Sequence, residues 1–190
     1  MSIGDIHHRE SRLENTIEKL KTCNHISDHN RELILEFKDF IQAQDLSLDR
    51  TCRYLYNWYQ ITEIVDFELD DPDKTDLVEL VRKIHQDELR DDASKYQKME
   101  WKKAIRKVYT DWLESKNPGF DGEELCDFFT LTVEKNNINP EELPKPRHIQ
   151  KLIRAADRTS HKALIAVTWS SMGRISEVLG LQWQDISFKD

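Results

Sequence analysis

Basic residues are concentrated between positions 95 and 107, where they have the spacing of one helical face. Four of them recur at intervals of three, four and four residues, and these are Lys95, Lys98, Lys102 and Arg106. This spacing places side chains on one stripe of an α-helix, and Lys103 and Lys107 widen the stripe. Such a stripe can contact phosphates in or across the major groove of DNA. A merely solvated helix face is the alternative, but Glu100 is the only acid in the segment, which favours a DNA contact.

A second set of polar side chains shares a face of the helix that the sequence predicts from Asp49 to Val65. Its members are Arg50, Arg53, Tyr54 and Asn57. Arg can pair with phosphate or guanine, and Asn can read adenine. Two arginines on a helix are ordinary when considered alone. A clamp of two crossing helices would explain this face and the basic stripe together.

Amphipathic helices must position both sets, and the apolar periodicity predicts an all-α fold. A short helix carries Leu13, Ile17 and Leu20, and Ser27 or Asp28 can cap the next one. Further helices are expected at 49–65, from a cap at Thr75, and from Asp92 or Ser94 to Glu114, with Trp101, Ile105, Val108 and Trp112 inward. A weaker helix is expected from Leu125 to Asn136, and three more at 149–156, 161–169 and 174–181.

Composition narrows the function classes. The chain has 190 residues, a formal net charge of −8 and only five Gly, so a glycine-rich phosphate loop is absent. No apolar run approaches the length of about 20 residues that a membrane span needs, and we predict no membrane partner. The three Cys are predicted to be reduced thiols. Cys23, His25 and His29 lack a further ligand cluster, so we predict no metal site and no cofactor.

Three of the five prolines lie between 140 and 146, which marks a linker. Beyond it, residues 173–186 read GRISEVLGLQWQDI. This string resembles the first catalytic motif of the tyrosine recombinases, the phage-integrase family. The segments "SDHNRELILEF", "LSLDRTCRYL" and "WKKAIRKVYTDWL" are similar to archaeal integrases. The resemblance spans roughly residues 12–190.

The resemblance implies a domain organisation. It implies a flexible N-terminus (1–12), a helical, SAM-like core-binding domain that clamps DNA (13–116), a connecting segment and linker (117–146), and the first helices of a catalytic domain (147–190). These enzymes attack a DNA phosphodiester with a tyrosine hydroxyl and form a covalent phosphotyrosine. The family usually has Gly two places before its first catalytic arginine, where this chain has Met172.

By the same resemblance Arg174 is that catalytic arginine, which stabilises negative charge on the phosphate at the transition state. A surface ion pair with Glu177 would be the ordinary reading of Arg174 alone, and we expect Glu177 to be structural. The family's lysine, His-x-x-Arg and nucleophilic tyrosine follow this motif and cannot be placed here. We therefore expect this portion to bind double-stranded DNA without cutting it, in the cytoplasm on the nucleoid, with a homo-oligomer on DNA as a possible state.

Three interpretations remain open at this point. The chain is either part of a recombinase or a non-catalytic DNA-binding regulator that competes with a complete recombinase for its site. A third reading is a helical protein-interaction module whose acidic body is the working surface. Such a module would capture a basic protein and ignore duplex DNA.

Overall fold

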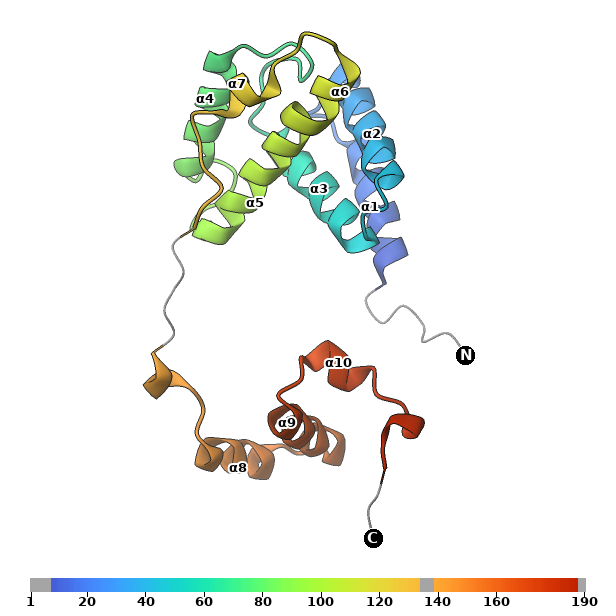
Figure 1. Ribbon diagram of the computed structural model, residues 1–190, viewed down its shortest axis with the longest axis vertical. Coiled ribbons are helices and arrows are strands. Elements are labelled where there is room, and N and C mark those ends of the chain that lie inside the picture. The colour runs from blue at the N-terminus through green and yellow to red at the C-terminus, as the bar shows by residue number, and fades with distance from the viewer. Residues whose placement is uncertain (1–7, 134–138, 188–190) are drawn as a thin grey trace. The chain divides into compact units, whose positions relative to one another are not determined.

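The computed structural model describes residues 8–133 and 139–187, and the regular elements in these ranges are all helices, without a strand (Figure 1). The prediction of an all-α fold is therefore confirmed. The described residues divide into two compact units, one at 8–133 and the other at 139–187. Each unit is described by itself.

The first unit is a bundle in which one long helix continues through a π-helical stretch. Its elements are α1 (Arg9–Thr22), α2 (Asp28–Ala43), α3 (Leu48–Ile61), α4 (Lys74–His85), α5 (Lys95–Arg106), the π-helix Lys107–Leu113, α6 (Glu114–Lys116) and α7 (Gly122–Cys126). Helix α3 packs against both α1 and α5, and it lies between them in Figure 1. The helix expected from Asp49 to Val65 thus ends earlier, at Ile61.

Side-chain caps fix where several helices begin. The Ser27 hydroxyl accepts a hydrogen bond from the Asn30 N–H at 3.1 Å, and the Ser94 hydroxyl accepts one from the Gln97 N–H at 3.2 Å. Both contacts satisfy N–H groups that the first helical turn leaves without partners. Helix α4 begins at a capping box of Asp73 and Asp76, so the cap expected at Thr75 is wrong by two residues. The carboxylate of Asp73 accepts from the N3 backbone, as the capping-box pattern requires.

Large aromatic side chains join α3 to α5 in the core. Trp58 and Trp101 are both fully buried. The Trp58 indole donates to the Ala104 carbonyl oxygen at 3.2 Å, and the Trp101 indole donates to the Gln60 side-chain oxygen at 3.1 Å. Each indole therefore buries its ring and still satisfies its N–H across the helix pair. The predicted inward face of the long helix is confirmed, because Trp101, Ile105, Val108 and Trp112 are all buried.

The segment after α7 departs from the expected helix over 125–136. Helix α7 ends at Cys126, and residues 127–133 have no regular structure. Two α5 side chains donate to carbonyl oxygens here, Arg106 to Cys126 at the end of α7 and Lys102 to Thr130 in the segment. These contacts satisfy two backbone acceptors from α5, and the apolar residues of the segment pack without helical periodicity. The end of the expected helix, beyond 133, lies outside the described residues.

Residues 117–133 belong to the first unit and pack against its helices. Phe120, Leu125, Phe128 and Leu131 lie against its buried core, and Phe129 belongs to that core. Gly122 approaches the π-helical stretch so closely that an added Cβ would lie 2.1 Å from the Tyr109 carbonyl oxygen. Only a residue without a side chain permits this approach. The connection expected at 117–146 therefore contributes its first half to the bundle.

The second unit consists of short helices with little buried surface. They are α8 (Pro146–Ala155), α9 (Thr159–Ser171) and α10 (Ile175–Leu179), with 3₁₀ turns at Pro140–Glu142 and Trp183–Asp185. Ile149 is the one buried residue in the described part of this unit. Leu152, Leu179 and Trp183 are more than half exposed.

Candidate nucleic-acid interface

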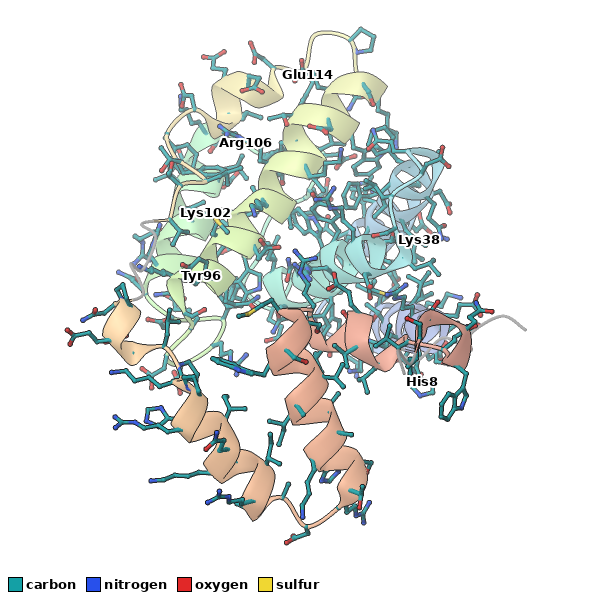
Figure 2. The ribbon with its side chains drawn as sticks, turned by 60° about the horizontal axis from the view of Figure 1, so that its bottom comes forward. His8, Lys38, Tyr96, Lys102, Arg106 and Glu114 are labelled. Atoms are coloured by element: carbon teal, nitrogen blue, oxygen red, sulfur yellow. The ribbon has the colours of Figure 1, made fainter. Side chains whose placement is uncertain are left out.

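Three cations of the predicted stripe, Lys98, Lys102 and Arg106, bond to neighbouring segments of the first unit. Figure 2 labels Lys102 and Arg106 on α5. The Lys98 ammonium donates at 2.9 Å to the His85 carbonyl oxygen and at 2.9 Å to the Asp87 carboxylate. The Lys102 ammonium donates to the Thr130 carbonyl oxygen at 2.8 Å. The Arg106 guanidinium donates to the Cys126 carbonyl oxygen at 3.3 Å and lies 5.5 Å from the centre of the Phe129 ring. We call Lys98, Lys102 and Arg106 the tie residues.

The electrostatics of the tie residues fit this structural role. Burial lowers the pKa of the Lys102 ammonium. The hydrogen bond from Lys98 holds the pKa of the Asp87 carboxyl below its usual range. Burial, followed by the charges of Lys102 and Lys98, lowers the pKa of the His85 imidazole. These three cations are committed to contacts inside the first unit.

The other three members of the stripe have different surroundings. Lys95 is exposed, with its ammonium 5.9 Å from the centre of the Tyr96 ring. Lys107 forms an ion pair with Asp111 one turn later. Lys103 lies on the side of α5 that faces α3 and pairs with Glu100 at 2.8 Å. The stripe is therefore divided between the two sides of α5.

A polar cleft opens where α1, α3 and α5 meet. Two hollows of about 470 Å³ and 360 Å³ share Asp49, Arg53, Asn57 and Glu100 in their walls. Together they form what we call the α3–α5 cleft. Its cationic walls comprise Arg12, Lys19, Arg50, Arg53, Arg90 and Lys103, and its acids are Asp49 and Glu100. The cleft is thus locally cationic in a chain whose net charge is −8, which is the kind of surface that attracts a polyanion.

The predicted pair of arginines on α3 belongs to this cleft. Arg50 is exposed, and the side chain of Arg53 is 65% exposed. Arg53 lies 3.6 Å from the Glu100 carboxylate, across the cleft. Arg12 is also 65% exposed and lies 3.9 Å from Asp49, which pairs more closely with Arg9 at 2.8 Å. An extended guanidinium with this exposure can reach a phosphate.

Asn57 is not placed to read a base. It is only 3% exposed, and its amide donates to the Glu100 backbone carbonyl oxygen at 3.2 Å. Tyr54 is half-buried, and its ring meets the edge of Phe37 at a centroid distance of 6.2 Å. The expectation that Asn57 recognises adenine is therefore wrong, because a buried amide is used to join α3 to α5.

Arg174 stands at the N-terminus of α10, and its side chain is 85% exposed. The Arg174 N–H donates to one oxygen of Glu177 at 2.8 Å, and its guanidinium donates to the other at 3.0 Å. Both bonds hold the pKa of the Glu177 carboxyl below its ordinary value. Glu177 thus has the structural role expected from the sequence, because its carboxylate accepts from the Arg174 backbone N–H at the start of α10.

The residue two places before Arg174 has a left-handed backbone. Met172 ends α9 with φ 53° and ψ 18°, and it is 80% exposed. A non-glycine residue is disfavoured by about 1–2 kcal/mol in this region. Gly is the residue that adopts it without steric cost. The backbone at position 172 therefore has a conformation that Gly would adopt with less strain than Met.

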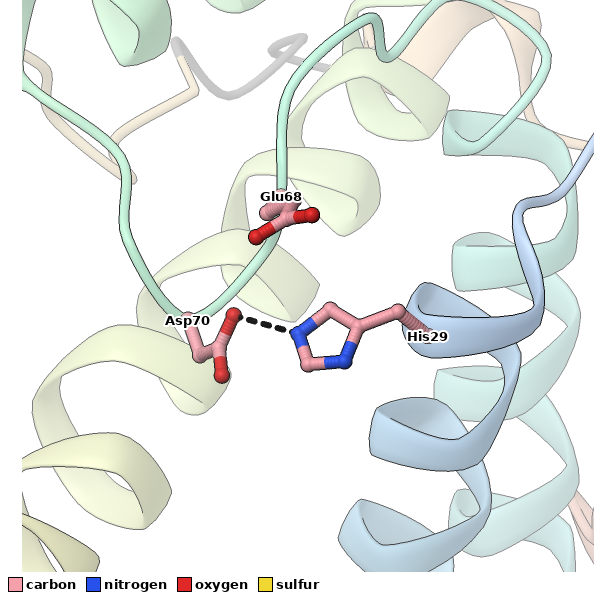
Figure 3. Close-up of side chains that lie close together, drawn as sticks. All are labelled: His29, Glu68 and Asp70. Carbon is pink, nitrogen blue, oxygen red and sulfur yellow. Dashed lines mark hydrogen bonds and ion pairs between the residues drawn. The ribbon is translucent and has the colours of Figure 1, made fainter.

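His29, Glu68 and Asp70 form a separate cluster outside the cleft (Figure 3). Their ligand-capable atoms lie within 4.8 Å of one another. The His29 imidazole and Asp70 carboxylate are 2.8 Å apart, and this hydrogen bond raises the pKa of His29. Cys23 and His25, considered with His29 in the sequence, are not part of it.

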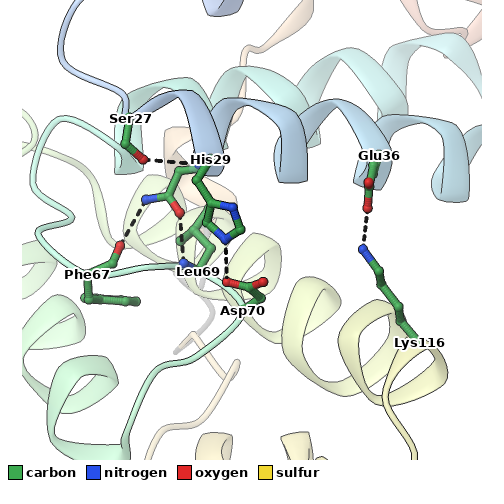
Figure 4. A network of polar contacts seen from close by, with 8 residues as sticks. Ser27, His29, Glu36, Phe67, Leu69, Asp70 and Lys116 are labelled. Carbon is green, nitrogen blue, oxygen red and sulfur yellow. Dashed lines mark hydrogen bonds and ion pairs between the residues drawn. The ribbon is translucent and has the colours of Figure 1, made fainter.

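Buried Asn30, the residue after His29, connects α2 to the loop that carries Glu68 and Asp70. Figure 4 shows the pair of His29 and Asp70 beside the labelled loop residues Phe67 and Leu69. Its amide donates to the Phe67 carbonyl oxygen at 2.9 Å, and its side-chain oxygen accepts from the Leu69 N–H at 2.9 Å. The loop at 67–70 is thereby fixed against α2. The pair of His29 and Asp70 is a second connection between the same two segments. The pair of Lys116 and Glu36 instead connects α6 to α2.

Comparisons with family models, curated proteins and solved structures find no match for this chain. Among the residues at 8–133 and 139–187, no helix is both long and apolar enough to cross a lipid bilayer. The cleft and the exposed Arg174 are therefore interpreted from their own geometry and from the resemblance at 173–186.

Proposed function

We propose that this chain is the DNA-binding portion of a site-specific tyrosine recombinase. The α3–α5 cleft would grip the backbone of double-stranded DNA, and Arg174 would meet the reacting phosphate in the complete enzyme. The observation that carries the proposal is the cleft itself. It gathers six cations from three helices and a loop around two acids, in an acidic chain.

The surroundings of Arg174 support the recombinase part of the proposal. The left-handed backbone at Met172 is the conformation for which the family's Gly is suited. Glu177 fixes the backbone of Arg174 at the start of α10, while the guanidinium is left 85% exposed. An exposed fork of N–H donors can exchange a surface carboxylate for a phosphate, since surface ion pairs are weak.

The proposal gives Arg174 a defined chemical task. Its N–H groups would donate to nonbridging oxygens of the phosphodiester as negative charge grows during attack by a tyrosine. In a complete recombinase the tyrosine–DNA bond then stores the energy for strand joining. Under this proposal, the described residues supply the DNA contacts of the cleft and one donor to the reacting phosphate, the Arg174 guanidinium. In the cell, DNA binding would associate the protein with the nucleoid, and a homo-oligomer could assemble on the duplex.

A direct binding experiment tests this function. The full chain is titrated into a short fluorescein-labelled duplex, and anisotropy is followed from about 50 to 200 mM salt. We expect saturable binding. The logarithm of the association constant should fall linearly with the logarithm of the salt concentration, with a slope of about −0.9 for each phosphate neutralised. The absence of binding at low salt, together with capture of a basic protein in a pull-down, would instead favour a protein-interaction module.

A further inference from the structure

Glu100 occupies the centre of the α3–α5 cleft and holds cations from both of its walls. Its carboxylate lies 2.8 Å from the Lys103 ammonium, on the same helix, and 3.6 Å from the Arg53 guanidinium, on α3. Glu100 lines both hollows of the cleft. Two of the six cations that line the cleft, Arg53 and Lys103, are therefore already paired with Glu100 in the free protein.

The position of Glu100 is fixed by buried structure. The Asn57 amide, 3% exposed, donates to the Glu100 backbone carbonyl oxygen at 3.2 Å. The next residue, Trp101, is fully buried and donates to Gln60 of α3. These contacts hold this turn of α5 against α3. The Glu100 carboxylate, only 24% exposed, is thus kept in the cleft.

A carboxylate and a phosphate compete for the same donors. Arg and Lys form charge-assisted hydrogen bonds with both kinds of anion. A phosphate that enters beside Glu100 also meets its like charge, which costs energy in a partly desolvated cleft. A duplex must therefore release Arg53 and Lys103 from Glu100 before it gains them.

We propose that Glu100 is an internal competitor of the DNA backbone, which occupies Arg53 and Lys103 in the free protein and lowers the affinity of the cleft for duplex DNA. This inference rests on the proposed function, because it assigns a regulatory residue to the same cleft. Its consequence is that weak, isolated phosphate contacts are rejected. Only a ligand that reaches several cations of the cleft together displaces the carboxylate.

The test is Glu100→Gln in the full chain, which removes the charge and preserves the shape. The matched control is Glu79→Gln on α4, because Glu79 also forms an exposed i,i+3 ion pair, with Arg82, and does not line the cleft. We expect Glu100→Gln to tighten duplex binding by about tenfold at physiological salt, since two ion pairs of the cleft cease to compete with phosphate. Glu79→Gln should change the dissociation constant by less than about twofold, because a distant exposed charge is screened.

A second background separates competition from a general effect of charge. In the Arg53→Gln/Lys103→Gln variant, Glu100 has neither of these cations to hold. The gain from Glu100→Gln should therefore be several-fold smaller than in the wild type, because only the relief of like-charge repulsion remains. Equal gains for Glu100→Gln and Glu79→Gln would overturn the inference, as would an equal gain with and without Arg53 and Lys103. If the wild-type chain bound no duplex in any salt, the proposed function would fail instead, and the two failures are therefore distinguishable.

Discussion

The two sides of α5 carry similar cations and use them differently. On one side Lys98, Lys102 and Arg106 donate to carbonyl oxygens of neighbouring segments, at the ends of α4 and α7 and at Thr130. On the other side Lys103 is paired with an acid that lines an open cleft. When a cation leaves a backbone carbonyl oxygen that it satisfies, that oxygen loses its hydrogen bond, which costs free energy. A cation in a surface ion pair can exchange its carboxylate partner for a phosphate at little cost. The partner of each cation, more than its spacing, decides whether it is available to DNA.

The largest expected effect is the loss of DNA binding when the cleft is neutralised. The triple variant Arg50→Gln/Arg53→Gln/Lys103→Gln should weaken duplex binding by roughly 100-fold, at about 1 kcal/mol for each lost charge-assisted contact. The salt slope should fall by about 0.9 for each lost contact. Anisotropy over a salt series measures both quantities. A triple variant that binds as tightly as the wild type would remove the cleft from the interface.

The opposite side of α5 should respond in stability and not in binding. Arg106→Met removes the donor to the Cys126 carbonyl oxygen and the contact with the Phe129 ring. We expect the free energy of unfolding in urea to fall by about 2 kcal/mol. Duplex affinity of the folded variant should remain within about twofold. A large loss of affinity with unchanged stability would show that the two sides have been assigned the wrong way round.

A smaller effect is expected from the pair of Lys98 and Asp87, through pH. The pKa of Asp87 is lowered in the folded state, so its contribution to stability is present above the unfolded pKa of about 3.9. That contribution is lost as pH falls through the folded pKa, because the unfolded state then binds the proton more readily. Urea denaturation from pH 6 to pH 3 should show a shallower loss for Asp87→Asn. Identical pH profiles of the wild type and Asp87→Asn would contradict a stabilising contact between Lys98 and Asp87.

The smallest effect is a change in the titration of His85. Burial, Lys102 and Lys98 lower its pKa, whereas the hydrogen bond to Asp70 raises that of His29. The two imidazoles should therefore titrate on opposite sides of about 6.5 in an NMR titration. Lys102→Met should raise the pKa of His85, and Lys103→Met, on the cleft side, should leave it unchanged. Equal shifts of the His85 pKa in both variants would contradict the assignment of Lys102 and Lys103 to different sides of α5.

Much of the helical framework could be predicted from apolar periodicity and caps. Leu33, Ile34, Phe37 and Ile41 are buried on one face of α2, and Ser27 and Ser94 cap their helices as expected. The irregular path of the segment at 127–133 could not be predicted, because it depends on contacts with α5, such as the hydrogen bond from the Lys102 ammonium to the Thr130 carbonyl oxygen.

The candidate site was predicted only in part. Arg50, Arg53 and Lys103 line the cleft, but Arg12, Lys19 and Arg90 come from α1 and from the loop before α5. No spacing within one helix connects these residues. Nor does helical spacing show which side of a cationic stripe will meet a neighbouring carbonyl, as it does for Lys102. Such contacts depend on tertiary packing, which is why half of the stripe was assigned to DNA without allowance for its structural role.

An NMR titration of the isotopically labelled full chain with duplex DNA tests the central claim most directly. The side-chain resonances of Arg50, Arg53 and Lys103 should shift most, and those of Lys98, Lys102 and Arg106 should move little. The largest shifts at Lys98, Lys102 and Arg106, with none in the cleft, would contradict the account.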